Sequence, residues 1–405
     1  MLRSLFITIA LVLFSFATTT VTRTQGGQTS TLEHFAPSPT ETVLHAFLLC
    51  CGDGIHPQGG LIEDQNGDLF GTTIDKGTCC GTVYELIPRV SGYKRQNVYA
   101  FTSSADGSAP HGTLVAANGA LFGVTQIGGS KGFGTIYELV LTGAGVRHII
   151  LHDFQGPPDA QTPFSGLVYD GAGSFYGVGD GGKNFGAVYK LTLEASSPRE
   201  SVVYRFQSQT DGENPIGRLV VDGAGRLYGV TIRGGKTGNG TVYRIGGPHE
   251  HRVLYDFEGG TDGSEPTAGL LVGNDGALYG TTYGGGVYSR GTVFKLASTA
   301  HGYAETKVYD FGPAPDGANP VAGLVVDASG DFFGTTSAGG AKNFGTVFEL
   351  IPTPSGYVES ILHSFDGVPD GRRPITELML DAQGNIYGTT TFGGKGWGTV
   401  FKVTL

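Results

Sequence analysis

The chain has 405 residues, of which 70 are glycine, and a formal net charge of −10. Phosphate backbones are bound by clustered Lys and Arg, so this acidic composition argues against nucleic acid as a partner. So much glycine indicates either a flexible chain or a fold with many fixed turns, and only the order of the residues can separate the two.

The N-terminus reads as an export signal. Arg3 precedes a mostly apolar run, Leu5 to Phe16, which small residues follow. We therefore predict a signal peptide over about residues 1–24 and a secreted or periplasmic protein. The run is shorter than the roughly 20 residues of a membrane span, and no second run reaches that length, so we expect no span after cleavage. The polar stretch 25–40 is predicted to be a disordered lead-in.

From residue 41 onward one segment recurs seven times. The glycine that opens its GTV-type motif returns every 51 to 54 residues, at Gly81, Gly134, Gly186, Gly240, Gly291, Gly345 and Gly398. A fixed period of this length indicates a repeat architecture. We therefore interpret residues 41–405 as one domain.

Each unit contains four short β-type segments and no helical pattern. In the copy that follows Pro320 they are residues 324–327, 332–336, 346–351 and 358–365, and residues 366–374 read as a loop into the next unit. Four strands in about 52 residues are typical of a β-propeller blade, whereas β-solenoid rungs take about 20–30. The sequence predicts an all-β, seven-bladed propeller with four antiparallel strands per blade.

The phase of the repeat predicts how the ring closes. The fragment GLVVDASGDFFG resembles the start of an NHL-type blade, whose first strand lines the channel. The repeats then begin with an outer, fourth strand at residues 41–47 and end with a third strand at 398–405. Residues 41–47 should complete the last blade and leave no open sheet edge. The alternative phasing, with the outer segment innermost, gives no such closure.

The full pattern, YDFxxxxDGxxPxxGLxxDxxGxLYGTTxxGGxxxxGTVFxL, resembles the tandem repeat of the choice-of-anchor GloVer family of bacterial surface proteins over residues 41–405. The resemblance implies an exported, repeat-built protein without an assigned enzymatic activity. Members often carry a C-terminal surface anchor, whereas this sequence stops at Leu405 within a strand. We therefore expect a soluble monomer.

An aspartate recurs in the loop that enters each blade. The positions are Asp53, Asp106, Asp159, Asp211, Asp262, Asp316 and Asp370. Rings of oxygen ligands can bind calcium, but Asp-Gly before Pro is also ordinary turn chemistry. Because a feature common to all copies reflects what every blade requires, we interpret this acidic ring as structural and expect no metal or cofactor.

Positions at which the copies differ are better candidates for binding. The residue before the first Leu of the inner strand is small in five copies (Gly60, Thr113, Gly166, Gly269 and Gly323) but is Arg218 or Glu377 in the others. A charge beside the axis can hold a charged ligand, or it can be solvated or paired with Arg372 and Arg373. Trp397, the single tryptophan, can stack on a carbohydrate or cap the last blade.

The cysteines form two vicinal pairs. Cys50 and Cys51 lie in the loop that enters blade 1, and Cys79 and Cys80 lie in its glycine-rich loop. In an exported protein such pairs predict a disulfide between the two loops, although a double bridge would be strained. A four-cysteine zinc site is the alternative, but the CxxC spacing is missing.

Three histidines share one position of the outer strand. His45, His152 and His363 stand where the other copies have tyrosine, two residues before a constant Phe. They read as half-buried rings with a polar tip. Because they lie on different blades, they cannot converge on one ion.

The sequence contains no nucleophile elbow, HExxH motif or catalytic carboxylate pair. It therefore favours an exported, non-enzymatic binding scaffold for a protein or a glycan. The alternative is a propeller lyase or hydrolase with a metal-dependent site at the axis, for which His or carboxylates from several inner strands should converge. A third class, a structural surface-layer component, would self-associate.

Overall fold

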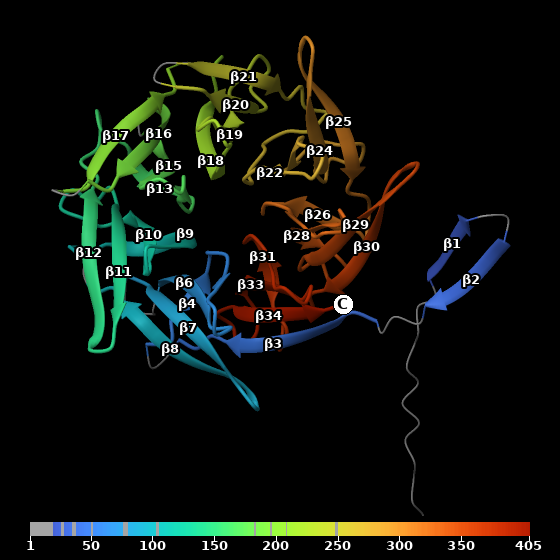
Figure 1. Cartoon of the computed structure of the whole chain (residues 1–405), viewed down its shortest axis with the longest axis horizontal. Coiled ribbons are helices and arrows are strands. Elements are labelled where there is room, and N and C mark those ends of the chain that lie inside the picture. The colour runs from blue at the N-terminus through green and yellow to red at the C-terminus, as the bar shows by residue number, and fades with distance from the viewer. Residues whose placement is uncertain are drawn as a thin grey trace, which may run out of the picture.

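The computed structural model describes residues 19–25, 28–34, 38–49, 52–75, 80–102, 105–181, 184–194, 197–207, 209–247 and 250–405. Seven β-sheets stand around a central axis like the blades of a propeller (Figure 1). Within the described ranges no helix is long and apolar enough to cross a membrane.

The blades follow one another in chain order. The innermost strand is continuous in blades 2 and 4, split into two short pieces in blades 1, 3, 6 and 7, and represented by one short strand in blade 5. Blade 1 contains β4 (Ile55–Pro57), β5 (Ile62–Glu63), β6 (Leu69–Asp75), β7 (Thr82–Arg89) and β8 (Gly92–Ala100). Blade 2 contains β9 (Ser108–Ala117), β10 (Ala120–Ile127), β11 (Thr135–Thr142) and β12 (Gly145–Asp153). Blade 3 contains β13 (Gln161–Pro163), β14 (Val168–Tyr169), β15 (Ser174–Gly181), β16 (Asn184–Thr192) and β17 (Arg199–Arg205).

The second half of the ring repeats the arrangement. Blade 4 contains β18 (Glu213–Val221), β19 (Leu227–Arg233), β20 (Thr241–Ile245) and β21 (His251–Asp256). Blade 5 contains β22 (Leu271–Val272), β23 (Leu278–Thr282), β24 (Thr292–Thr299) and β25 (Gly302–Asp310). Blade 6 contains β26 (Gly317–Pro320), β27 (Val325–Val326), β28 (Phe332–Gly339), β29 (Thr346–Thr353) and β30 (Gly356–Ser364). Blade 7 contains β31 (Arg372–Pro374), β32 (Met379–Leu380), β33 (Ile386–Phe392), β34 (Thr399–Thr404) and β3 (Thr40–Ala46).

The seventh blade is made from both ends of the domain. β3 pairs antiparallel with β34, from Thr40 opposite Thr404 to Ala46 opposite Thr399 (Figure 1). The predicted fold, the phase of the repeat and the closure of the ring are thereby confirmed. A separate two-stranded sheet precedes the ring, in which β1 (Thr19–Gln25) pairs with β2 (Gln28–His34).

The inner strand begins earlier in the structure than we expected from the sequence. Residues 372–374, expected within a loop, form β31 and pair with β33, with Pro374 opposite Thr390. Every blade has a proline at the position of Pro374, and the residue before that proline adopts a positive φ, as Arg373 does at 58°. Its N–H turns to the neighbouring blade and donates to the Phe344 carbonyl at 2.8 Å. This left-handed residue lies within the first piece of the inner strand, and a proline-containing pattern does not reveal it.

The glycine of the GTV motif recurs because it packs closely against the proline of the next blade. A Cβ atom on Gly345 would lie 2.8 Å from Pro374 Cδ, and one on Gly398 would lie 2.7 Å from Pro57 Cδ. Both glycines also have a positive φ, near 100°, which side chains disfavour. The glycine that recurs most regularly in the repeat therefore contacts the proline of the following blade. At Gly398 this contact joins blade 7 to blade 1 and closes the ring.

Aromatic side chains fill the space between adjacent blades. Phe311 meets Phe348 edge to face at 5.1 Å between ring centroids, and Phe365 meets Phe401 at the same distance. One buried cluster joins Phe47 and Val400 of blade 7 to Leu61 and Tyr84 of blade 1. The core is thus a circle of interfaces between blades, and closure completes it.

Inside six blades a pair of threonine hydroxyls joins the second strand to the third, as Thr336 and Thr346 do at 2.8 Å. The glycine of the Asp-Gly loop packs on this pair, and a Cβ atom on Gly317 would lie 2.5 Å from Thr336 Cγ2. Blade 3 carries Ala160 in place of that glycine, and there the paired positions are Gly179 and Ala187. The added methyl group is compensated by the loss of both threonines.

Candidate functional site

Three successive residues of each inner strand lie at or behind the channel wall, and we call these positions the first, second and third tiers. The first tier follows the constant proline and contains Gln58, His111, Phe164, Ile216, Thr267, Val321 and Ile375. The second contains Gly59, Gly112, Ser165, Gly217, Ala268, Ala322 and Thr376. The third contains Gly60, Thr113, Gly166, Arg218, Gly269, Gly323 and Glu377.

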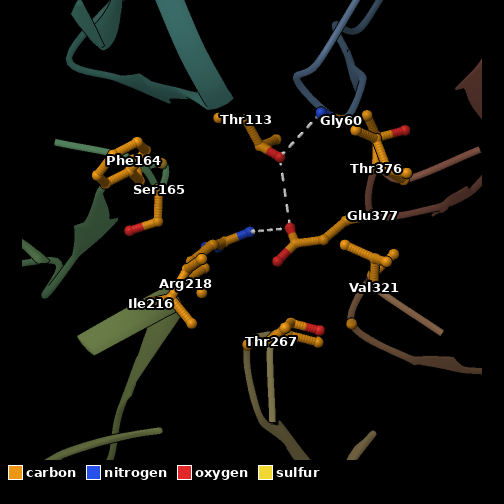
Figure 2. Close-up of a pocket in the computed structure, with 18 of the residues that line it drawn as sticks. Gly60, Thr113, Phe164, Ser165, Ile216, Arg218, Thr267, Val321, Thr376 and Glu377 are labelled. Atoms are coloured by element: carbon orange, nitrogen blue, oxygen red, sulfur yellow. Dashed lines mark hydrogen bonds and ion pairs between the residues drawn. The ribbon is translucent and has the colours of Figure 1, made fainter. Parts of the chain in front are cut away.

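Glycine at four of the seven third-tier positions leaves room for two long side chains. Arg218 of blade 4 and Glu377 of blade 7 reach toward each other across the axis (Figure 2), with Nη1 3.8 Å from Oε2. Thr113 of blade 2 donates its hydroxyl to the same Glu377 oxygen at 3.4 Å and accepts a hydrogen bond from the Gly60 amide at 3.2 Å. Arg218 and Glu377, which the sequence singled out as separate candidates, thus meet at the axis and form an ion pair with each other.

This bridge divides the channel. A cavity of about 150 Å³ on the side of the first tier is lined by all three tiers, including Arg218 and Glu377. A second cavity, of about 330 Å³, begins at the same two residues and runs between Leu219, Leu270 and Leu378 toward the opposite face. Figure 2 shows the first cavity, with Phe164, Ile216 and Val321 around the charged pair. We call this first cavity the axial pocket.

The rim of the axial pocket has a polar arc and an apolar arc. His111 Nε2 lies 3.0 Å from Gln58 Oε1, which can only accept, so Nε2 carries the proton. Burial lowers the pKa of His111, which is therefore neutral near pH 7. Phe164, Ile216, Val321 and Ile375 form the apolar part of the wall. Sequence reasoning missed this rim; the variable position after each constant proline was the signal that could have found it.

Trp397 does not line the axial pocket. Its carbonyl accepts a hydrogen bond from the His56 amide at 2.9 Å, and its ring lies 5.4 Å from the His56 ring, between centroids. It packs beside the cluster that joins blades 7 and 1. The structure therefore places this candidate over the closing interface, apart from Arg218 and Glu377.

The acidic ring is held within the fold. Each aspartate accepts hydrogen bonds from a main-chain amide of its own loop and from the His or Tyr ring of the preceding blade's outer strand. Asp370, for example, lies 3.0 Å from His363 Nε2 and 2.8 Å from the Asp366 amide. Because imidazole and phenol can both donate to the carboxylate, His and Tyr replace each other at this position.

The predicted disulfide stays a prediction. Cys50, Cys51 and Cys79 lie outside the described residues, and Cys80 is buried with its carbonyl 3.2 Å from the Ala109 amide of blade 2.

A larger cavity, of about 610 Å³, lies between blades 4 and 5 away from the axis, and Arg226, Arg244 and Arg252 line it. Two of these charges are paired, because Arg226 Nε lies 2.7 Å from Asp222 and Arg244 lies 3.1 Å from Glu250. Tyr228 and Tyr303 also line this groove. We take the axial pocket as the candidate site because it is lined by Arg218 and Glu377, the positions at which the copies of the repeat differ in charge.

The family model described as Gloeobacter/Verrucomicrobia repeat matches residues 15–221 and 179–401. No curated protein matches the sequence. Among solved structures, the periplasmic gluconolactonase of Pseudomonas aeruginosa is similar at 18% identity and a TM-score of 0.52, covering 82% of this chain and 93% of its own. A candidate 6-phosphogluconolactonase from Bacteroides uniformis ATCC 8492 is similar at 12% identity and a TM-score of 0.50, covering 78% and 86%. At these identities the likeness shows the fold.

Proposed function

This chain belongs to the Gloeobacter/Verrucomicrobia repeat family, and we propose that it is an exported, non-enzymatic binding protein that takes its ligand at the axial pocket. Export rests on the predicted signal peptide. The observation that carries the binding role is the Arg218–Glu377 bridge, which stands across the axis where the other copies have small residues.

The bridge is suited to opening. Its atoms are 3.8 Å apart, and the side chains of Arg218 and Glu377 are 43% and 27% exposed. An exposed, long ion pair contributes at most about 1 kcal/mol, so a ligand that supplies a partner to either charge can replace it at little cost. The fold gains little from the pair, whereas a ligand would gain a donor and an acceptor at one point.

The walls favour a glycan end as the ligand. A cavity of about 150 Å³ is large enough for a six-membered ring. A sugar ring offers hydroxyl groups to Gln58 and the bridge, and an apolar face to Phe164. A loop of a partner protein that presents a polar tip is the alternative occupant.

A glycan array followed by calorimetry with the best glycan tests the proposal. We expect Arg218→Ala and Glu377→Gln to weaken binding at least tenfold, while Arg89→Ala, an exposed arginine of blade 1, leaves it unchanged. Binding that persists in both axial variants, or no binding to any glycan, would contradict a glycan-binding axial pocket.

Lactone hydrolysis is the second candidate function. His111 and Glu377 line the same pocket as Arg218, and two similar propellers carry the names of lactonases. The assay is gluconolactone hydrolysis with and without added divalent cations. A rate that falls at least a hundredfold in both His111→Gln and Glu377→Gln would favour the enzyme over the binding protein.

A further inference from the structure

Three side chains meet at every interface between blades, which we call a seam. Two are the loop aspartate and the His or Tyr of the preceding blade's outer strand. The third lies on the outer strand of the following blade, four residues before that blade's own His or Tyr. In seam order from blade 7/1 to blade 6/7, these third residues are Arg95, His148, Glu200, His251, Glu305, Glu359 and Glu41.

Two seams combine an imidazole with two carboxylates. His152, Asp159 and Glu200 meet between blades 2 and 3, and His363, Asp370 and Glu41 meet between blades 6 and 7. Within each triad one ligand atom per residue lies within 4.8 Å of the others. The His Nε2 to Asp Oδ2 distance is 3.0 Å in both. The same chemistry is thus built twice, from the same three positions of the repeat.

A second observation points into these triads. Oε1 of Glu200 and Oε1 of Glu41 are buried, and neither has a hydrogen-bond partner among the described residues. Glu305 and Glu359 have the same unpartnered oxygen, but their seams contain tyrosine in place of the imidazole ligand. A buried carboxylate oxygen without a partner is disfavoured, so these oxygens require a proton or a cation.

The seam between blades 7 and 1 shows what such a site accepts. It has His45 and Asp53 in the same places, but Arg95 replaces the glutamate, and its guanidinium Nε lies 3.2 Å from Asp53 Oδ1. Where the glutamate is absent, a cation of the protein itself stands beside the same His–Asp pair. In the remaining four seams a tyrosine replaces the histidine.

We propose that the His152–Asp159–Glu200 and His363–Asp370–Glu41 triads are binding sites for a divalent transition-metal ion of the Zn²⁺ type. His Nε2, an aspartate oxygen and a glutamate oxygen supply three ligands, and a water molecule completes a tetrahedron. Calcium does not fit, because it takes six to eight oxygen ligands. The ion displaces the glutamate proton, and the imidazole proton is released or carried on Nδ1, so binding liberates protons.

The ions would join blades. Each triad takes its histidine from one blade and its glutamate from the next, and Glu41 lies on β3, the strand that closes the ring. Metal binding would therefore stabilise the closing blade against separation from blade 6, because an ion bound only by the folded state shifts unfolding by mass action.

Zinc titration of EDTA-treated protein with alkylated cysteines tests this proposal. We expect two equivalents of Zn²⁺ to bind by calorimetry, Co²⁺ to give tetrahedral absorption bands, and protons to be released. His152→Tyr and His363→Tyr should each remove one equivalent, and the double variant both. Tyrosine occupies this position in four other seams and keeps the bond to aspartate, so these variants retain the fold, which circular dichroism verifies.

A gain of function completes the test. Arg95→Glu should create a third equivalent at His45 and Asp53, whereas Arg95→Gln should not. Absence of saturable zinc binding in the wild type, or an unchanged stoichiometry in the double His→Tyr variant, overturns the proposal. Neither result depends on the glycan-binding role of the axial pocket.

Discussion

The same seven repeats form the seams and the channel wall, yet substitutions between the copies have different consequences in the two regions. At a seam a substitution keeps the contact with the loop aspartate: both His363 and Tyr309 bind it, and Arg95, which stands where other seams have glutamate, lies 3.2 Å from Asp53. In the channel Gln58, His111 and Arg218 replace small or apolar residues without altering their own blades. Seam positions contact two blades and vary among side chains that keep a polar contact, whereas channel positions face space that a ligand can fill.

The largest effect is expected where a seam closes the ring. A Cβ atom on Gly398 would lie 2.4 Å from the Thr390 carbonyl oxygen and 2.7 Å from Pro57 Cδ, in addition to a φ of +102°. We expect Gly398→Ala to lower the free energy of unfolding by about 3 kcal/mol or more, measured by urea denaturation. The control is Gly396→Ala, whose φ is +113° but whose Cβ meets nothing within 4 Å. It should cost only about 1–2 kcal/mol. Equal losses would mean that the contact with blade 1 is unimportant.

The matched changes of blade 3 can be transferred to blade 6. Gly317 does not have a positive φ, so Gly317→Ala tests steric contact with Thr336 and Thr346 alone. We expect a loss of about 2 kcal/mol. In a background of Thr336→Gly and Thr346→Ala the same change should cost at least 1 kcal/mol less, as a double-mutant cycle measures. Strict additivity would show that the pattern of blade 3 is accidental.

A seam without histidine predicts how stability depends on pH. Burial, reinforced by Asp316, raises the pKa of Glu359 from 4.5 to about 8. The folded protein therefore holds a proton that the unfolded chain releases, so this contribution is complete below about pH 4.5 and is lost as pH rises through 8. The urea midpoint in EDTA should fall between pH 6 and pH 9, and Glu359→Gln should flatten that fall. A slope unchanged in the variant would remove Glu359 from the explanation.

The smallest effect on stability belongs to the channel. Arg218→Ala and Glu377→Gln each remove one partner of an exposed bridge, so the free energy of unfolding should change by no more than about 1 kcal/mol. Thermal unfolding with and without ligand measures this. A loss as large as that of Gly398→Ala would make the bridge part of the scaffold.

The fold could be predicted from the sequence because its signal is repeated seven times. Gly398 and the outer strand at residues 41–47 suffice to infer a ring closed by its first strand. The early start of the inner strand could not be inferred, because the left-handed residue before each proline varies in type from His56 to Arg373. The N–H of Arg373 donates to a carbonyl of the preceding blade, a contact that no local propensity encodes.

The site was predictable only where a residue broke the consensus in charge. Arg218 and Glu377 stood out against glycine and do meet, while Trp397 stood out by its rarity and lies elsewhere. His111 and the seam glutamates were missed because each looks ordinary within its own strand. Their meaning depends on which side chains of the neighbouring blade face them, as Glu200 faces His152.

Ring closure also sets an order of events. β3 is synthesised before every other strand of the ring, yet its partner β34 is synthesised last. β3 therefore has no partner strand while the intervening blades form. The β3–β34 contact that closes the ring joins segments far apart in the sequence. A chain interrupted before β34 would retain an exposed outer strand and an open end. Pairing of β3 with β34 therefore removes the free sheet edge of the last blade.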